Sequence, residues 1–266
     1  MWIGLRKVSP EKRGIATGIG LSSFAHAPFI FGYIFSCIIN PDNKPPTRTI
    51  IYGDEKLKLF DKDVFSRLPM TIRYLSLILL ILGIFAAVIM YDKSLNTSKI
   101  THTITFKQLF KEYKSWYLLA LNFLKMLFFM FIIYVYKTVG LLYIDYEYLL
   151  SYIGGAGFLS AAILRVFIGR AHDKYPWHKI NFITTLLELI IIQVYYYTLP
   201  YRALYAISTI LLIGISGTSY LCLWILCDMV FPKDKWVFSF VSLGGVIATF
   251  MAFIVFAFIF YPVRII

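Results

Sequence analysis

Charged side chains are scarce in this sequence. Asp, Glu, Lys and Arg together make up 15% of its 266 residues, whereas about 25% is usual for a soluble domain. Hydrophobic residues account for 59% of the chain, and they occur in blocks of about twenty, the length that spans the hydrocarbon core of a bilayer. The composition therefore excludes an ordinary soluble domain and predicts a polytopic, all-α membrane protein.

Cysteine and histidine are also rare, with three and four residues respectively. Cys37, Cys222 and Cys227 lie in or at the ends of apolar runs, without the spacing of a metal site or a disulfide framework. We expect them to be small packing residues. The sequence has no nucleophile motif, phosphate-binding glycine loop or dinucleotide fingerprint. We therefore expect no enzyme activity, no metal and no cofactor.

Acidic residues are outnumbered by basic ones, 14 to 26, and the formal net charge is +12. The basic residues lie mostly between apolar runs rather than along one helix face or arm, which argues against nucleic acid as a partner. Lipid headgroups explain them better, so we expect the lipid bilayer as the partner of this charge. We also expect no signal peptide, because the first apolar run is too long and lacks a cleavage site after it.

Seven apolar runs are long enough to be transmembrane helices. They cover residues 15–39, 74–91, 116–136, 149–168, 180–199, 203–231 and 236–261. Tyrosine and tryptophan gather at their ends, for example at Trp116, Tyr117 and Trp236, as in an interfacial belt.

Lysine and arginine indicate the orientation of the chain. They are concentrated before the first run and after the second, fourth and sixth runs, which all lie on one side if the seven spans hold. On the other side, only the segment 41–73 is rich in basic residues, and five acidic residues accompany its seven basic ones. We therefore place the N-terminus in the cytosol and interpret 41–73 as a long non-cytosolic loop. The residues 106–111 are expected to form a short amphipathic helix at the membrane surface.

Glycine recurs near the beginning of every third run. The residues are Gly14, Gly18 and Gly20 in the first, Gly154, Gly155 and Gly157 in the fourth, and Gly244 and Gly245 in the seventh. Small residues let transmembrane helices approach closely, and transporters are often built from three-helix repeats. Chance is the alternative explanation, since glycine is common in such helices.

Besides Asp228 near the end of the sixth run, three charged residues lie within apolar runs, where a charge is costly and usually functional. Arg165 lies about one turn inside the fourth run; it either extends toward the interface or faces a central cavity, where its guanidinium could bind a carboxylate. Lys125 and Glu188 lie near the middle of the third and fifth runs. They either pair with each other or contact a cavity separately. Lys137, at the end of the third run, is by position an interfacial lysine.

The connector after the fourth run has a recognisable pattern. It reads Gly169-x-x-x-Asp173-Lys174-x-x-x-His178-Lys179, and it resembles the loop signature of the major facilitator superfamily. In that signature an Asp and basic residues lock neighbouring helices in one state of alternating access. The resemblance implies that Gly169, Asp173 and Lys174 form a gating-loop motif.

Three further segments resemble the oxalate:formate antiporter and monocarboxylate transporter branch of that superfamily. They are Pro10-Glu-Lys-Arg13-Gly14-Ile-Ala-Thr-Gly18, Tyr136-Lys137-Thr-Val-Gly140 and Arg165-Val-Phe-Ile-Gly169. In monocarboxylate transporters an arginine four residues before the motif glycine pairs with the substrate carboxylate, and Arg165 occupies that place. The resemblance thus implies that Arg165 binds the substrate, with Lys125 and Lys137 supplying positive potential.

The sequence departs from the family pattern at several positions. His178 stands where an arginine is usual, and Pro176-Trp177 replaces the usual small residue. Ala161 takes the place of the acidic partner of monocarboxylate transporters, and the residues 236–261 lack the lysine of oxalate exchangers. These departures leave the identity of the substrate and the coupled ion open.

The resemblance covers almost the whole chain but only part of the family fold, because seven runs would correspond to helices 5 to 11 of twelve. We expect residues 1–91 to be a remnant of the N-terminal half, 92–115 to be a cytosolic linker, and 116–266 to be a C-terminal half without its last helix. The expected function is transport of small organic anions such as monocarboxylates, with a counter-anion or a proton as coupled partner, in a truncated form. The alternative is a seven-helix receptor-like or non-transporting membrane protein.

Overall fold

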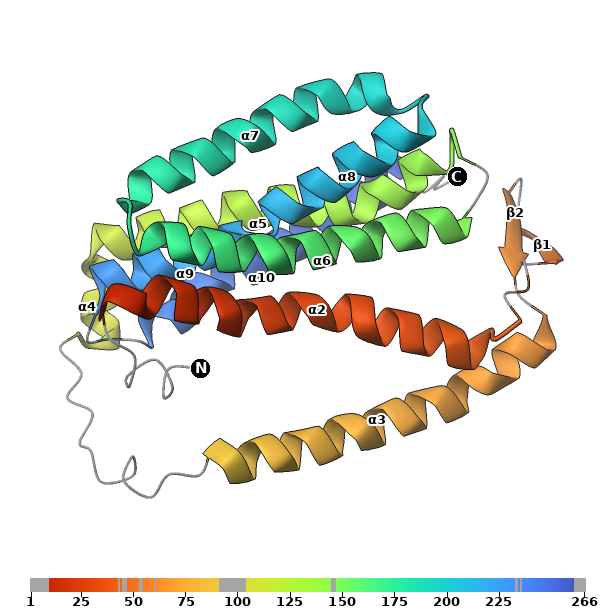
Figure 1. The fold of residues 1–266 in the computed structure, drawn as a ribbon, viewed down its shortest axis with the longest axis horizontal. Helices are drawn as coiled ribbons and strands as arrows, with labels where there is room; N and C mark the ends of the chain where they lie inside the picture. The colour runs from red at the N-terminus through yellow and green to blue at the C-terminus, as the bar shows by residue number, and fades with distance from the viewer. Residues whose placement is uncertain are drawn as a thin grey trace. The chain divides into compact units, whose positions relative to one another are not determined.

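The computed structural model describes residues 10–42, 44, 47–52, 55–59, 61–90, 104–144, 147–232, 234 and 236–260. Within this part of the chain nearly all residues are helical, and two short strands form a hairpin (Figure 1). The elements are η1 (Pro10–Lys12), α2 (Arg13–Ile39), β1 (Arg48–Tyr52), β2 (Glu55–Leu59), α3 (Lys62–Met90), α4 (Phe106–Lys111), α5 (Tyr113–Gly140), α6 (Glu147–His172), α7 (Trp177–Thr198), α8 (Arg202–Ser216), α9 (Ser219–Val230) and α10 (Val237–Phe260).

Seven helical segments of the described chain are long and apolar enough to cross a membrane. They are α2, α3, α5, α6, α7, the α8–α9 pair and α10. Large apolar side chains such as Leu80, Phe167 and Phe250 are exposed along them, as expected for helices whose outer surfaces contact lipid. The expectation of a multi-pass helical membrane protein is therefore confirmed.

The helices agree with the expected spans, except at two places. For α2, α5, α6, α7 and α10 each end lies within four residues of the expected boundary. The expected short helix at 106–111 is also confirmed, as α4.

The first exception is the segment 41–73, which we expected to be a loop. Its residues form the antiparallel hairpin β1–β2, which pairs Arg48 with Leu59 and Tyr52 with Glu55, and α3 already begins at Lys62 rather than at residue 74. Hydropathy locates only the apolar part of a helix, and the first turns of α3 are polar. The helix runs through Pro69, and the Thr71 hydroxyl donates to the carbonyl of Arg67 at 2.8 Å.

The second exception is the sixth expected span, 203–231, which is two helices rather than one. The α8–α9 break, at Ser216–Ser219, is a tightened turn in which the Thr218 N–H donates to the Ile215 carbonyl and the Leu221 N–H donates to the Thr218 carbonyl. The hydroxyl of Thr218 also donates to the Ile215 carbonyl, at 2.6 Å. Side-chain hydroxyls that compete for backbone carbonyls in this way disturb the regular helical pattern.

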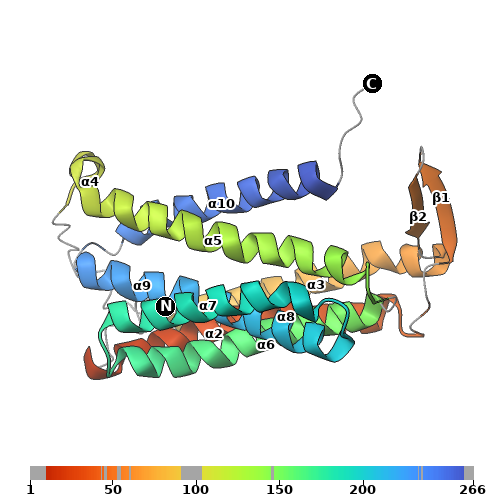
Figure 2. The same cartoon turned by 90° about the horizontal axis from the view of Figure 1, so that it is seen from above.

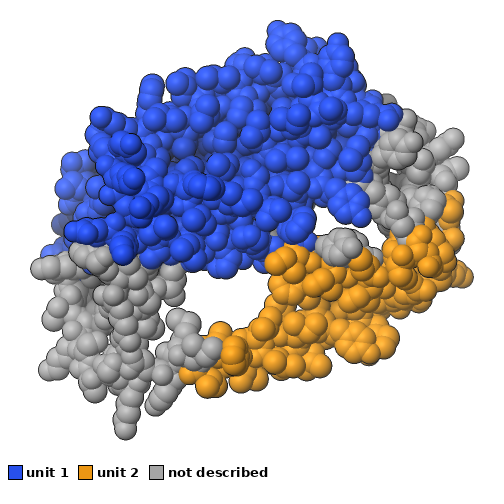
Figure 3. Space-filling model, viewed as in Figure 1, with its two compact units in different colours: residues 1–29, 102–266 blue, residues 30–101 orange. Residues whose placement is uncertain are grey.

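The described chain divides into two compact units, which Figure 3 colours separately. Unit 1 comprises residues 1–29 and 102–266, and unit 2 comprises residues 30–101. The family resemblance implied a different division, into residues 1–91, 92–115 and 116–266. That division refers to the two halves of a twelve-helix fold, and it stays a prediction.

In unit 1, α10 packs along α5 and α6 packs along α8. Figure 2 shows α5 and α10 side by side. One apolar cluster, which includes Leu118, Leu221 and Val241, joins α5, α9 and α10. A second, which includes Leu150 and Tyr205, joins the N-terminal ends of α6 and α8. The first half of α2 also belongs to this unit, and it packs on α6.

In unit 2, the residues after α2 are tied to the start of α3. The Lys44 ammonium donates to the Asp63 carboxylate at 2.7 Å, and this hydrogen bond raises the pKa of Lys44. Asn40 bonds to the backbone of Lys44 through both its amide groups. These contacts hold the chain where it leaves α2.

Candidate functional site

The backbones of α2 and α6 approach each other closely at three glycines. A Cβ atom added at Gly14 would overlap the carbonyl oxygen of Gly169, and one added at Gly18 would overlap the carbonyl oxygen of Arg165. Gly169 is restricted in the same way by the carbonyl of Gly14. Two rows of residues spaced four apart thus face each other, and only glycine allows the helices to lie this close. The close approach expected at Gly14 and Gly18 is confirmed, whereas the three-helix repeat stays a prediction.

Asp173 binds the N-terminus of α2 across this contact. The N–H of Gly14 donates to Oδ1 at 2.7 Å, and the N–H of Ile15 donates to Oδ2 at 3.0 Å. The first N–H groups of a helix have no partner within the helix, and a carboxylate there also interacts favourably with the helix dipole. Residues 14, 18, 165, 169 and 173 form what we call the α2–α6 contact. The connector residue Lys174 is exposed and lies outside it.

Arg165 is buried, with only 4% of its surface exposed. Its Nε and Nη2 donate to the carbonyl of Gly217 at 3.0 and 2.7 Å, and its Nη1 donates to the carbonyl of Leu21 at 2.6 Å. The side chain therefore points into unit 1 rather than toward the interface. It joins α6 to α2 and to the α8–α9 break, and it satisfies a carbonyl that the break removes from the helical pattern.

Ala161, one turn before Arg165, also has a structural explanation. It forms a fully buried cluster with Ala162 and Ala25 of α2, and a Cβ added at Gly217 would lie 2.9 Å from the Cβ of Ala161. An acidic side chain would not fit between these helices. The acidic residue that monocarboxylate transporters carry would therefore have no room here, where α2, α6 and the α8–α9 break are tightly packed.

Lys125 and Glu188 form a buried ion pair, so the paired alternative is confirmed. The Lys125 ammonium donates to the Glu188 carboxylate at 2.7 Å and to the Thr185 hydroxyl at 2.7 Å, and the two charged side chains are 16% and 5% exposed. The other Glu188 oxygen accepts from Ser219, the first residue of α9, at 3.2 Å. Glu188 thus compensates the charge of Lys125, whose expected role in substrate binding requires the pair to open.

Lys137 lies at a different depth from Arg165. It is half-buried in the last turn of α5, next to Tyr136. The Tyr136 side chain faces Gly154 of α6, which precedes Arg165 by eleven residues, or roughly 16 Å of helix. The three cationic residues expected to serve one substrate are therefore not gathered at one point; their substrate roles stay predictions.

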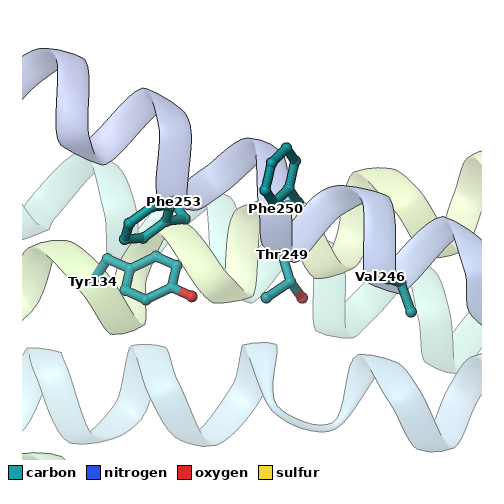
Figure 4. Close-up of a pocket in the computed structure, with 5 residues that line it drawn as sticks. All are labelled: Tyr134, Val246, Thr249, Phe250 and Phe253. Carbon is teal, nitrogen blue, oxygen red and sulfur yellow. The ribbon is translucent and has the colours of Figure 1, made fainter.

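Two features of unit 1 were not expected from the sequence. The first is the α8–α9 break, to which the buried side chains of Arg165 and Glu188 are both hydrogen-bonded. The only signal of this break in the sequence is the run of small and hydroxyl-bearing residues Ser216-Gly217-Thr218-Ser219. The second is a shallow, open pocket between α5 and α10, shown in Figure 4, with a volume of about 430 Å³. Its lining consists of Tyr134, Val246, Thr249, Phe250 and Phe253. No charged side chain lines this pocket, so it does not suit an anion.

Among the described residues, no cluster of His, Cys, Asp or Glu could hold a metal ion. The chain matches no family model, and no curated protein or solved structure matches it. The seven apolar helices are those of a multi-pass integral membrane protein. Its function has to be argued from the α2–α6 contact and the buried charges.

Proposed function

We propose that this protein is a transporter of the facilitator type for small organic anions such as monocarboxylates. The observation that carries the proposal is the hydrogen bond that Asp173 accepts from Gly14 at the N-terminus of α2, which joins residues 159 positions apart. This contact agrees with the locking role that the family resemblance implies for the connector Asp. In this proposal the α2–α6 contact is a gate, closed in the present state.

The composition of the contact suits a gate. Its partners are glycines, backbone carbonyls and one carboxylate, so α2 and α6 can separate without breaking the hydrogen bonds within either helix. Separation removes the two hydrogen bonds that Asp173 accepts and the one that Arg165 donates to the Leu21 carbonyl, and each hydrogen bond to a charged group contributes about 1.5–3 kcal/mol. A ligand that binds the separated state more tightly can offset a cost of this size.

Arg165 is the proposed anion-binding residue behind this gate. Its guanidinium has five N–H donors, and three of them make the bonds to Gly217 and Leu21. When α2 moves away the bond to Leu21 is lost, and three donors become available to a carboxylate. A substrate anion would thus replace a backbone carbonyl as the partner of a buried charge.

Uptake by proteoliposomes that contain the full-length natural protein tests this proposal, with labelled lactate, formate and oxalate as substrates. The variant is Arg165→Gln, because a glutamine amide can still donate to the Gly217 carbonyl while the charge is gone. Its matched control is Arg170→Gln, which removes an exposed charge from the same helix.

We expect saturable uptake of at least one anion. Arg165→Gln should lower the uptake efficiency about 10- to 100-fold, the effect of losing one or two charge-assisted hydrogen bonds, and Arg170→Gln should leave it unchanged. Uptake that is equal in the two variants would refute the role of Arg165. A folded wild-type protein that takes up no anion would refute the transporter proposal and leave the receptor-like or non-transporting alternative.

A further inference from the structure

The short helix α4 has a fixed position in unit 1. Six residues are too few for a helix that is stable alone, but three features hold this one. Thr105 and Gln108 form a capping box at its start, Leu109 is fully buried, and the indole N–H of Trp116 donates to the carbonyl of Phe110 at 2.9 Å. We call residues 105–117 the α4–α5 elbow.

Aromatic rings attach the elbow to the start of α10. The ring of Phe110 packs edge-to-face against Phe240 and Trp116, with centroid distances of 5.3 and 5.7 Å. Yet Phe106, Phe110 and Trp116 remain 61%, 43% and 47% exposed. Aromatic residues that are half in contact with protein at the ends of apolar helices are typical of the membrane–water interface. The elbow thus has the pattern expected of a segment at the level of the lipid headgroups.

The same elbow presents three exposed lysines, Lys107, Lys111 and Lys114. Lys107 and Lys111 are four residues apart and share one face of α4. Glu112 is the one acidic residue among residues 105–117, and within the described part of the chain no ion pair joins it or any other acidic side chain to these lysines. Judged by the described residues, the elbow is thus a cationic surface whose lysines have no acidic partner, beside exposed aromatic rings.

We propose that the α4–α5 elbow binds the phosphate of an anionic phospholipid headgroup through Lys107, Lys111 and Lys114. Lysine ammonium groups are point charges on flexible stems, which suits a mobile headgroup, and the exposed rings suit the glycerol and upper acyl region beside it. A site for a soluble phosphate would need convergent N–H donors or a guanidinium fork, and the described residues of the elbow offer neither. This inference does not depend on transport activity.

The elbow lies at the end of unit 1 where α7 begins and the α6–α7 connector lies, as Figures 1 and 2 both show. Arg170 and Lys179 are exposed at that end as well. A general attraction of basic residues to lipid would involve these two equally. A specific binding site requires that Lys107 and Lys111 contribute more to the lipid affinity than Arg170 and Lys179 do.

Native mass spectrometry of the detergent-solubilised, full-length protein tests this difference, with titrations of dioleoylphosphatidylglycerol and dioleoylphosphatidylcholine. The test variant is Lys107→Gln with Lys111→Gln, the control is Arg170→Gln with Lys179→Gln, and Lys107→Arg with Lys111→Arg keeps the charge. A lysine near an anionic lipid surface contributes about fivefold in affinity.

We expect the first phosphatidylglycerol to bind at least tenfold more tightly than phosphatidylcholine. The glutamine pair in the elbow should weaken it about 25-fold, whereas the control pair and the arginine pair should change it less than threefold. Equal affinity for the two lipids, or equal losses in the two glutamine pairs, would overturn the proposal. Competition by soluble glycerol phosphate would overturn it too, because the site would then recognise a free phosphate rather than a lipid.

Discussion

Replacing Asp173 by asparagine tests how strongly the α2–α6 contact is held. Asp173 accepts hydrogen bonds from the Gly14 and Ile15 N–H groups at 2.7 and 3.0 Å. Asparagine keeps one acceptor oxygen, so the variant loses one charge-assisted bond, about 1.5–3 kcal/mol, and the interaction of a charge with the helix dipole, about 0.3–1 kcal/mol. We therefore expect the contact to weaken by about 2–4 kcal/mol.

Hydrogen exchange of the backbone amides measures this loss directly. A change of about 2–4 kcal/mol corresponds to about 30- to 700-fold faster exchange in the peptide that contains the first turn of α2, provided that exchange proceeds through opening of the contact. The matched control is Glu11→Gln, because Glu11 is exposed near the same helix terminus. This variant removes one negative charge but leaves both hydrogen bonds that Asp173 accepts in place. Exchange in Asp173→Asn within twofold of wild type would refute the reasoning.

Two further predictions concern stability, measured as the thermal unfolding midpoint in detergent. Glu188→Leu alone should destabilise the protein by about 3–5 kcal/mol, because it leaves the Lys125 charge buried and unpaired, and adding Lys125→Met should restore most of the loss; no recovery in the double variant would contradict this. Gly18→Ala should cost about 1–3 kcal/mol, because its Cβ would overlap the Arg165 carbonyl. In Gly32→Ala, the Cβ would meet no described atom within 4 Å, so helix propensity should make this control neutral or stabilising; equal losses in the two glycine variants would argue against the close approach.

The sequence was sufficient to predict features that depend on composition along the chain. Apolar runs located five helices to within four residues, and the 106–111 pattern located α4. The pairing of Lys125 with Glu188 was open in the sequence, because each lies mid-run and nothing local fixes which helices are neighbours. The structure brings α5 and α7 close enough for a 2.7 Å bond, and this information comes only from tertiary packing.

The features that sequence reasoning missed depend on hydrogen bonding rather than hydropathy. The run from 202 to 230 is apolar enough on average to be read as one span, yet hydroxyl groups and a tight turn divide it at Ser216–Ser219. Likewise the polar first turns of α3, from Lys62 onward, are helical although hydropathy places them in a loop. Both errors have one cause. Hydropathy reports whether a side chain prefers water or lipid, and it does not report where the backbone N–H and C=O groups find hydrogen-bond partners.

The α8–α9 break also changes how the buried charge of Arg165 should be interpreted. A carbonyl freed in the interior needs a donor, and Arg165 donates to Gly217 twice. A neutral amide would meet that need without burying a guanidinium, whose removal from water costs several kcal/mol. A charge used only to support a turn is therefore an expensive solution, and its presence favours a second, anionic partner in another state. For this reason Arg165→Gln separates the two roles: a purely structural arginine predicts that uptake survives whenever the variant folds, whereas an anion-binding arginine predicts a folded protein in which uptake is lost.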